Sequence, residues 1–553
     1  MTIGIDFGTE SGRVLLLDLR TGQEIAVVEV RYPHGVIDSR LPSNDEELPP
    51  DTALQDPGDY LDVLYRGIPD ALVAGDVRTE EVIGIGIDFT ACTVLPVTED
   101  GTPLCQLDRW RDHPHAWVKL WKHHAAQPVA DRLNEVAIER GEDFLARYGG
   151  RLSSEWYFPK LIETWQKDRA VFDAMSAFVE ATDWIVWHLT GTLIRASCSA
   201  GYKACWSAKE GLPSRAFFEA AYPDFPDPSQ KLGTSFVPPG RRAGTLRPVV
   251  AARLGLNPTV AVAVGNVDSF VAVPGAGVQR PGVFVMVVGT SICDLVIDRR
   301  EIRMPGITGV VENGILPGYF GYEAGQAAVG DMFAWFGGRL LGLTSGDSGA
   351  GTNWYEELER AAASIPPGAS GLVALDWWNG NRTILGDADL SGVIAGLTLA
   401  TTPTEIYRSL LESVAFGTRR IVENFVDHDV ALTEVVACGG IAERSVLMMQ
   451  LLADVTGMPV TIPDSSQIPA RGAALFGALA AGSARGGFDD IERAITELRP
   501  ETSGHYEPSQ VNTVTYDEIY SVFRALHDEL GREHVEWLHR LKQIRRAASA
   551  ARP

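Results

Sequence analysis

The stretch TIGIDFGTESGRVLLLDLR, residues 2–20, predicts two apolar strands joined by a tight turn. Gly8 supplies the turn, because glycine adopts backbone conformations that other residues avoid. A similar stretch, VFVMVVGTSICDLVID, returns at residues 283–298 with Gly289-Thr290-Ser291 in its turn. Each stretch has an apolar strand, Gly-Thr, a serine within two residues and a second apolar strand. The chain therefore carries two hairpins of one pattern, separated by about half its length.

We interpret these hairpins as an internal duplication in which each half of the chain opens with one of them. This interpretation puts a boundary near residues 270–282 and predicts two domains, residues 1–275 and 276–553. Two unrelated hairpins that share a turn composition are the competing interpretation.

Strands alternate with helical stretches in both halves, which is the pattern of α/β domains. We expect each domain to be a mixed sheet with helices on both faces, and the two domains to flank a deep cleft. The pattern predicts strands over 82–90 and 434–440 and a strand running into a turn over 259–270. It predicts helices over 179–191, 402–425, 445–456, 470–482 and 516–546.

The composition is that of a packed globular protein, because 45% of the 553 residues are hydrophobic and 22% are charged. A formal net charge of −24 repels nucleic acid and anionic membranes, so neither is an expected partner. The six cysteines form no Cys-x-x-Cys pair, and the N-terminus opens on a strand and not on a signal peptide. These features predict buried free thiols and a cytoplasmic location. No apolar run approaches the ~20 residues that span a bilayer.

Both hairpin turns are candidate phosphate cradles. No GxxxxGK(S/T) loop occurs in the sequence, so phosphate would have to be held in another way. A turn of Gly, Thr and Ser offers backbone N–H groups and hydroxyls, and its glycine lets phosphate approach closely. The candidates are Gly8-Thr9-Glu10-Ser11 and Gly289-Thr290-Ser291, one in each domain.

Two charged residues flank the first turn. Asp6, at the end of the first strand, is placed to orient Mg²⁺ through water, and Arg13 on the returning strand could neutralise phosphate. The competing interpretation makes Asp6 a turn-capping residue and Arg13 a surface charge.

Asp268 follows an apolar strand in VGNVDSF and is a candidate general base for a hydroxyl group. It could equally cap the helix that follows, which is the commoner role of an isolated Asp. The pair Gly439-Gly440 could admit a flat adenine ring or simply end a strand.

Two further patterns are dismissed. Gly346-Asp347-Ser348-Gly349 imitates the tetrapeptide around a serine-protease nucleophile, but it lies in a Gly/Ser loop of an α/β chain. His123 and His124 are adjacent, so on a helix they would not face one metal ion.

Taken together, the motifs resemble the FGGY family of carbohydrate kinases, in the superfamily of actin and hexokinase. The resemblance extends from Ile3 to about Gly482 and implies two actin-like, ribonuclease H-like domains around an interdomain cleft. Five motifs occur in the order of the family: IGIDFGTESGR (3–13), SSEWYFPKLIETW (153–165), GNVDSF (265–270), VVGTSICDL (287–295) and CGGIAERSVLMMQLLADVTGMPV (438–460).

Within the family, four segments are similar to members that phosphorylate L-ribulose: GIDFTACTVLPV (86–97), LWKHH (120–124), CSAGYKACW (198–206) and GYFGYEAGQAAVGDMFAWF (318–336). Where xylulose and glycerol kinases carry a Gln-x-His-Gly type of loop, this chain has Thr90-Ala91-Cys92-Thr93. The usual substrate-contacting histidine is therefore missing, and Cys92 stands in its place.

The resemblance implies that Asp268 takes the proton from the terminal hydroxyl of the sugar. It implies a ketopentose site at Ala91, Lys203, Asp268 and Glu323. It implies a first phosphate loop at Asp6, Gly8, Thr9, Ser11 and Arg13, a second at Gly289, Thr290 and Ser291, and an adenosine-binding turn at Gly439, Gly440 and Ser445.

The implied reaction converts L-ribulose and ATP into L-ribulose 5-phosphate and ADP, with Mg²⁺ as the cofactor and Asp6 contacting it through water. The alternatives are another ketopentose or polyol kinase, acting on D-ribulose, ribitol or xylulose, and a non-catalytic actin-like ATPase. A homodimer is a further expectation.

Overall fold

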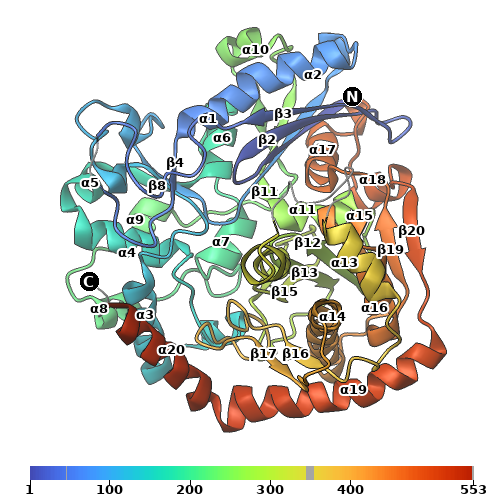
Figure 1. The fold of residues 1–553 in the computed structure, drawn as a ribbon. Coiled ribbons are helices and arrows are strands. Elements are labelled where there is room, and N and C mark those ends of the chain that lie inside the picture. Colours follow the sequence, from blue (N-terminus) through green and yellow to red (C-terminus); the bar gives the residue numbers. More distant parts are fainter. Residues whose placement is uncertain (45–46, 344–353, 551–553) are drawn as a thin grey trace.

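The computed structural model describes residues 1–44, 47–343 and 354–550. Within these ranges the chain forms two seven-stranded sheets with helices on their faces (Figure 1). The first sheet has the strand order β3-β2-β1-β5-β10-β9, and β11 also pairs with β5. Its strands are β1 (Thr2–Phe7), β2 (Ser11–Leu17), β3 (Glu24–Arg31), β5 (Gly84–Phe89), β9 (Arg242–Thr245), β10 (Ala261–Ala263) and β11 (Asn266–Val267).

The second sheet has the order β14-β15-β13-β12-β18-β19-β20. Its strands are β12 (Val283–Val288), β13 (Ile292–Asp298), β14 (Gly309–Glu312), β15 (Phe320–Gln326), β18 (Glu434–Cys438), β19 (Val460–Pro463) and β20 (Thr502–Tyr506).

The two sheets repeat one arrangement. Five strands correspond, and β14 of the second sheet has no counterpart among them. The first of the five pairs antiparallel with the second and parallel with the fourth, as β1 does with β2 and β5, and β12 with β13 and β18. A third strand continues the antiparallel side, β3 in one sheet and β15 in the other. A fifth strand continues the parallel side, β10 in one sheet and β19 in the other. This shared order supports the interpretation of the two hairpins as a duplication and not as a coincidence of turn composition.

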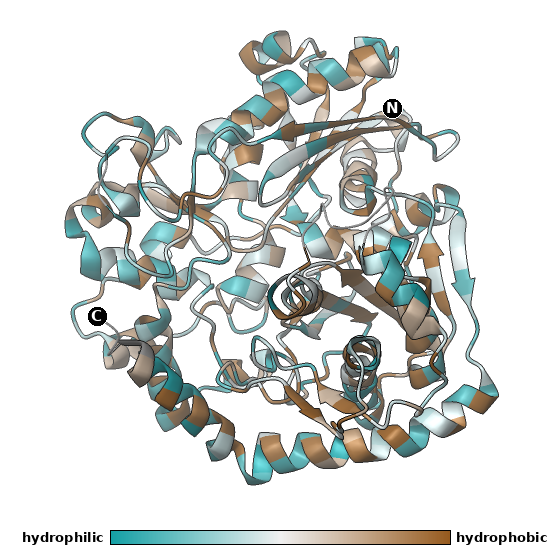
Figure 2. Cartoon of the chain, in the orientation of Figure 1, coloured by the Kyte–Doolittle hydropathy of each residue, from teal (hydrophilic) through white to brown (hydrophobic). Residues whose placement is uncertain are grey.

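Two helices, α11 (Asp268–Gly275) and α17 (Ile468–Ala481), lie between the two sheets and pack against each other. One hydrophobic cluster joins them to strands of both sheets, including Leu15 of β2 and Val285 of β12. The strands of both sheets are largely brown in Figure 2, and α17 lies beside the first sheet in Figure 1. The halves of the chain therefore share a core and do not have two isolated ones.

Glycines let α17 approach the first sheet. A Cβ atom on Gly4 of β1 would lie 1.7 Å from the carbonyl oxygen of Ala470, and one on Gly86 of β5 would lie 1.7 Å from that of Ala473. Both distances are far below van der Waals contact, so only glycine fits at these two positions. The sequence predicted a helix of small residues over 470–482, and the structure shows that its partners are strands from the opposite end of the chain.

Helices also cover the outer faces. The first sheet is covered by α1 (Pro57–Asp62), α2 (Ile68–Ala74), α6 (Ala181–Thr190) and α10 (Pro248–Leu254). The second is covered by α14 (Pro403–Asp427) and α16 (Val446–Thr456). Outside them, α19 (Gln510–Asp528) packs on α16, and α13 (Trp354–Ala363) packs on α14.

An additional layer lies beside the first sheet, around a hydrophobic cluster of its own. It contains the four-stranded sheet β4-β7-β6-β8 and several helices. Its elements are β4 (Leu54–Gln55), β6 (Val94–Val97), β7 (Val118–Lys119), β8 (Ala177–Glu180), α3 (Gln127–Arg140), α4 (Tyr157–Lys167), α5 (Arg169–Ala174), α8 (Arg215–Ala221) and α9 (Ser229–Leu232). The helix α7 (Ser197–Lys203) connects this layer to β14 of the second sheet.

Most of the predicted elements are present. The helix predicted over 402–425 is α14, and the predicted capping box is formed, with Thr402 and Glu405 bonded reciprocally. The helix predicted over 179–191 begins later, at Ala181, because residues 177–180 form β8. The stretch 259–270, predicted as a strand running into a turn, forms the short strands β10 and β11, and the helix α11 and not a turn begins at Asp268. The tail predicted over 516–546 divides into α19 and α20 (Val535–Ala550), which are separated by a π-helical turn.

Within the described ranges, no helix combines the length and apolar character needed to cross a membrane. The same ranges hold all six cysteines, and each is a free thiol.

The glycine contacts with α17 lead to a test of the shared core. Replacing Gly86 with Ala should lower the free energy of unfolding by about 3 kcal/mol, because an overpacked contact forces the backbone apart. Gly338→Ala is the matched control, since among the described residues its Cβ would meet only the carbonyl oxygen of Leu343, at 4.0 Å. Urea denaturation of both variants measures the effect. Equal stability of the two variants would contradict this account of the α17 contact.

Candidate active site

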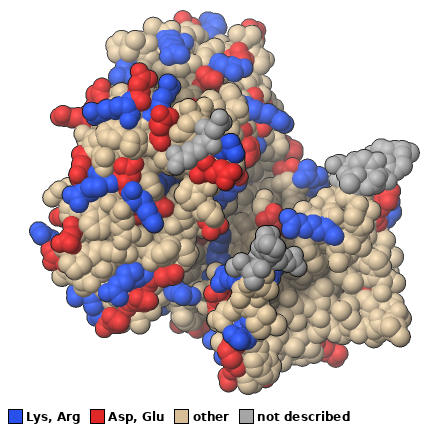
Figure 3. Space-filling model, turned by 60° about the vertical axis from the view of Figure 1, so that its left-hand side comes forward, with Lys and Arg blue, Asp and Glu red and all other residues tan. Residues whose placement is uncertain are grey.

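A cleft of about 770 Å³ separates the two halves of the molecule. Figure 3 shows the surface hollowed between two lobes, with acidic and basic side chains interspersed on this face. Four of the predicted site residues line the cleft: Lys203, Thr290, Ser291 and Glu323. It also takes in the segments before and after α3 and part of the segment 379–389.

The two predicted phosphate hairpins are closed in a similar way but differ in length, with four residues between the last strand pair of the first hairpin and three in the second. The N–H of Gly8 donates to the carbonyl of Ser11 at 3.0 Å, and the N–H of Gly289 donates to that of Ser291 at 2.9 Å. The hydroxyl of Thr9 accepts a hydrogen bond from the indole N–H of Trp121, at 3.1 Å. In both turns the N–H of the glycine donates to the carbonyl of the serine, but the first turn is one residue longer because it contains Glu10.

Neighbouring side chains modify the first hairpin. The Ser11 hydroxyl donates to Glu29 at 2.7 Å, so it is engaged by the third strand of the sheet. Arg13 forms an ion pair with Asp6, with 3.2 Å between Nη1 and Oδ2. Arg13 and Asp6 lie opposite each other on the paired strands β1 and β2. Arg13 therefore places its positive charge beside the hairpin and is not an isolated surface charge.

A second carboxyl group, not predicted from the sequence, lies beside Asp6. Strands β1 and β5 are parallel and in register, which pairs Asp6 with Asp88 and Phe7 with Phe89. The aromatic rings stack on the outer face, with 4.8 Å between their centroids. Because side chains alternate along a strand, the two carboxyl groups point to the opposite face, the one on which α17 packs. The signal was present as GIDF, which occurs at residues 4–7 and again at 86–89.

Asp88 is fully buried, and neither of its oxygens meets a hydrogen-bond donor among the described residues. Burial raises the pKa of Asp88 well above its usual value, and the negative charge of Asp6 raises it further. Strand β11 continues the row, since Asn266 pairs with Asp88 in parallel register. Polar residues therefore stand side by side at the carboxyl ends of β1, β5 and β11.

Asp268 is the first residue of α11 and follows directly on β11. It is not the N-cap, which is Val267, so the capping alternative is wrong in this form. Its Oδ1 accepts a hydrogen bond of 2.6 Å from the N–H of Ser269. Burial and, next, the charge of Asp6 raise the pKa of Asp268 to about 7, against the opposing effects of Ser269 and Lys203. A carboxyl group with that pKa is suited to accept a proton near neutral pH.

Lys203 and Glu323 come from opposite halves of the chain and form an ion pair in the cleft. The Lys203 ammonium lies 2.9 Å and 3.2 Å from the two oxygens of Glu323, and both side chains are buried. Burial lowers the pKa of Lys203, but the Glu323 carboxylate more than offsets this effect, so the pKa is raised above its usual value. The sequence predicted both residues as separate sugar contacts, whereas here they satisfy each other.

The remaining predicted residues lie around this centre. Ala91 follows β5 in the loop that also contains Cys92, and it packs against the shared core. Gly439 and Gly440 follow β18, the counterpart of β5 in the second sheet, and α15 (Gly440–Arg444) begins there. Ser445 caps α16 through the N–H of Met448 and donates to Glu359 at 3.0 Å. These contacts occupy the Ser445 hydroxyl in helix capping.

The two patterns dismissed in the sequence analysis are the histidine pair at 123–124 and the tetrapeptide at 346–349. His123 is buried and bonded to Glu163, whereas His124 lines the cleft. No group of three His, Cys, Asp or Glu side chains arranged to hold a metal ion occurs in the part of the chain that the structure describes. The tetrapeptide Gly346–Gly349 lies outside the described residues.

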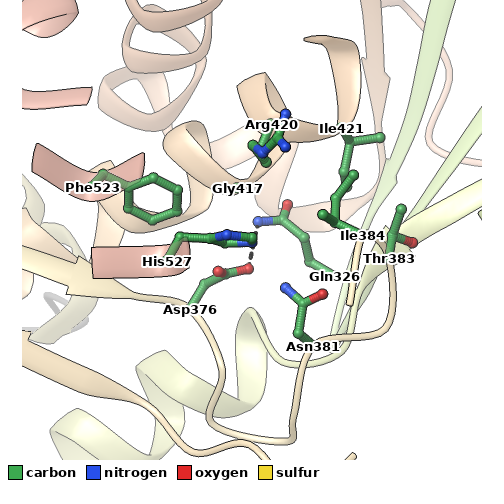
Figure 4. Close-up of a pocket in the computed structure, with 10 residues that line it drawn as sticks. All are labelled: Gln326, Asp376, Asn381, Thr383, Ile384, Gly417, Arg420, Ile421, Phe523 and His527. Atoms are coloured by element: carbon green, nitrogen blue, oxygen red, sulfur yellow. Dashed lines mark hydrogen bonds between the residues drawn. The ribbon is translucent and has the colours of Figure 1, made fainter. Parts of the chain in front are cut away.

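A separate small cavity of about 10 Å³, room for about one water molecule, lies among α14, α19 and residues 376–384 (Figure 4). Its lining includes Asp376, bonded to Gln326, and His527 of α19, and none of the predicted site residues.

The Lys203–Glu323 pair leads to a test by a double-mutant cycle. Lys203→Met should lower the free energy of unfolding by about 3 kcal/mol, because it leaves a buried carboxylate without its partner. The double variant Lys203→Met/Glu323→Leu should recover most of this loss. Arg215→Met, which breaks an exposed ion pair with Glu219, is the control and should have little effect. A double variant no more stable than Lys203→Met would contradict a direct interaction.

Comparisons with known proteins agree with this architecture. The chain is 48% identical to the ribulokinase of Anoxybacillus flavithermus, over all of this chain and 98% of that protein. It is 48% identical to the ribulokinase of Halalkalibacterium halodurans, over 98% of this chain and 97% of that protein. The ribulokinase of Mycolicibacterium smegmatis is 44% identical, over 98% and 96% of the two chains.

Among solved structures, the xylulose kinase of Rhodospirillum rubrum has the same fold, with a TM-score of 0.78, 24% identity and coverage of 97% of this chain and 99% of that one. The model of the N-terminal domain of the FGGY family of carbohydrate kinases matches residues 1–275, and that of the C-terminal domain matches residues 284–481. The two matches cover most of the length, and the chain belongs to the FGGY family of carbohydrate kinases.

Proposed function

We propose that this protein transfers the γ-phosphoryl group of ATP to the terminal hydroxyl of L-ribulose. The observation that carries the proposal is the full-length similarity, at 44–49% identity, to relatives named ribulokinase from several bacteria. The cleft supports the proposal. The ion pair of Lys203 and Glu323, whose groups can donate to and accept from sugar hydroxyls, lies in the same cleft as the hairpin turn at Thr290. Another ketopentose or polyol as the preferred substrate is the second candidate.

Asp268 acts as the general base in this proposal. Its carboxylate accepts the proton of the attacking hydroxyl as that oxygen forms its bond to the γ-phosphorus, and ADP leaves with the electrons of the broken bond. The pKa of about 7 supports this role, because the group is then largely ionised at slightly alkaline pH and still a useful proton acceptor. Lys203, whose charge lowers this pKa, helps to keep the carboxylate available.

The two hairpins hold the phosphates in this proposal. The backbone N–H groups and hydroxyls of the turns at Thr9 and Thr290 provide donors, and Arg13 provides positive charge. The turns come from opposite halves, so closure of the cleft would bring donors to both sides of the triphosphate and exclude water.

The carboxyl groups fit a hydrated Mg²⁺ ion. Asp6 and the unpartnered Asp88 stand side by side on the face toward α17, and a divalent cation favours the ionised form of such groups. Mg²⁺ held there by Asp6 through water would neutralise charge that develops on the phosphoryl oxygens. In this proposal Asp6 and Asp88 would orient the hydrated ion, and Arg13 would balance part of their negative charge.

Lys203 and Glu323 would bind the sugar by exchanging their direct ion pair for hydrogen bonds to a sugar hydroxyl. A hydroxyl group that bridges the ammonium and the carboxylate can both accept from Lys203 and donate to Glu323. Separating the Lys203–Glu323 pair costs free energy. A sugar without a matching hydroxyl forms no hydrogen bonds that offset this cost, so it binds more weakly.

A sugar panel tests the proposed reaction. The kcat/KM measured from ADP release should be highest with L-ribulose, lower with D-ribulose and ribitol, and lowest with xylulose and glycerol. A coupled spectrophotometric assay with each sugar, and without sugar, measures it. Xylulose or glycerol as the best substrate would overturn the choice of sugar, and ADP release that no sugar stimulates would overturn the kinase proposal.

The role of Asp268 has its own test. Asp268→Asn should lower kcat by about 10²–10⁴ while leaving nucleotide binding intact, which is the usual effect of losing a general base. In the unaltered protein kcat/KM should rise with pH through about 7, because the base works only after losing its proton. Asp294→Asn is the control for the loss of a buried carboxyl group from the second sheet. Near-normal turnover by Asp268→Asn would contradict the role of Asp268 as the general base.

A further inference from the structure

Lys160, in the middle of α4, is a buried ammonium group in an unusual environment. Its side chain is 0% exposed, yet no carboxylate of the described residues lies within ion-pair distance. Burial lowers its pKa. Taking an ammonium out of water is strongly unfavourable unless hydrogen bonds replace its hydration. Here the Lys160 Nζ donates to two main-chain carbonyl oxygens, that of Cys92 at 2.7 Å and that of Leu120 at 2.8 Å.

The first carbonyl belongs to the loop that follows β5 and contains Ala91. Cys92 has a φ of 50°, in the left-handed region that residues other than glycine rarely adopt. The loop is also held by a hydrogen bond between the hydroxyls of Thr90 and Thr93, at 2.7 Å. Lys160 therefore bonds the carbonyl of the residue whose backbone is the least favourable in this loop.

The second carbonyl belongs to a segment on the wall of the cleft. Leu120 is also bonded through its N–H to the carbonyl of Ala53, at 3.0 Å. The next residue, Trp121, lines the cleft and donates its indole N–H to Thr9 of the first phosphate hairpin. One ammonium group thus connects the loop at Ala91 with a segment that contacts the phosphate hairpin.

We propose that Lys160 is a positioning residue that holds the Ala91–Cys92 loop and the Leu120–Trp121 segment in the geometry required for sugar binding. Its two bonds to main-chain atoms fix backbone and not side chains, so they set where both loops lie. The inference rests on the proposed function, since it assigns Lys160 to the sugar side of that same site. Lys160 itself is behind the loops and is not a catalytic residue.

Lys119 offers a matched comparison. It is also 0% exposed and lies in the same layer, but it forms an ion pair with Glu163 at 2.5 Å and a hydrogen bond with Thr164 at 2.8 Å. Its third bond, of 3.2 Å, reaches the carbonyl of Lys160 within α4. Lys119 directly precedes Leu120 in the chain, but its ammonium stabilises the layer through a buried pair and bonds neither the carbonyl of Cys92 nor that of Leu120.

The experiment compares Lys160→Met, Lys160→Arg and Lys119→Met with the unaltered protein, using L-ribulose and ATP. Lys160→Met should raise the KM for L-ribulose at least about tenfold, because two buried carbonyls lose their donor and the loops relax. The KM for ATP should rise by less, because the bond from Trp121 to Thr9 is what connects the Leu120–Trp121 segment to the phosphate hairpin. Lys160→Arg keeps donors for both carbonyls and should recover part of the effect. Lys119→Met should lower the melting temperature without a selective change in the KM for L-ribulose.

A second readout follows the loop directly. Cys92 is 1% exposed, so a thiol reagent should label it slowly in the unaltered protein. Mass spectrometry of the labelled peptide should show faster modification in Lys160→Met than in Lys119→Met, because local opening exposes the thiol. If Lys160→Met does not fold, Lys160→Gln is measured in the same way.

Unchanged KM for L-ribulose together with slow labelling of Cys92, in any folded variant without the ammonium, overturns the inference. An equal rise of both KM values would also overturn it, since that result marks a general loss of structure. These outcomes differ from failure of the proposed function, in which the unaltered protein itself would not phosphorylate L-ribulose.

Discussion

The close contact between α17 and the glycines of β1 and β5 is the constraint on which the rest of the structure depends. Gly4 and Gly86 leave no room for a side chain, so the helix backbone lies directly on the sheet. Because α17 also packs against α11, the same contact fixes the helix that begins with Asp268. The glycines and the acidic residues of both strands lie on one face, since side chains alternate along a strand. Helix packing and the placement of the carboxyl groups are thus consequences of one pattern, Gly-Ile-Asp, used twice.

Electrostatics decides what this arrangement can do. Asp6, Asp88 and Asp268 interact with one another, and burial first and then the charge of Asp6 raise the pKa values of Asp88 and Asp268. Arg13, which is bonded to Asp6, places a positive charge there, and the hydrogen bond from Ser269 and the charge of Lys203 lower the pKa of Asp268. Such a site favours cations and proton acceptance, which is what transfer of a phosphoryl group to a hydroxyl requires.

The two halves meet through charged groups as well as through the shared core. Lys203 of α7 and Glu323 of β15 are 120 residues apart in sequence and form a buried pair in the cleft. Lys160 acts within one half only, but it too connects distant segments, since Cys92 and Leu120 are 68 and 40 residues away from it. In both cases one ammonium group joins segments that are distant in the sequence. Net charge alone does not reveal these contacts, because they depend on which buried groups the two lysines meet.

The sequence by itself determined the features that depend on neighbours along the chain. The two hairpins, the capping box of α14 at Thr402 and the small-residue helix α17 all carry local signals of composition and periodicity, and all are present. Local signals also determined Gly8 and Gly289 as turn residues. Only the tertiary structure decided that Asp6 lies beside Asp88, that Lys203 pairs with Glu323 and that Ser445 caps α16. These contacts arise from strand register and from burial between distant segments, and no periodicity within a short stretch of sequence encodes either of them.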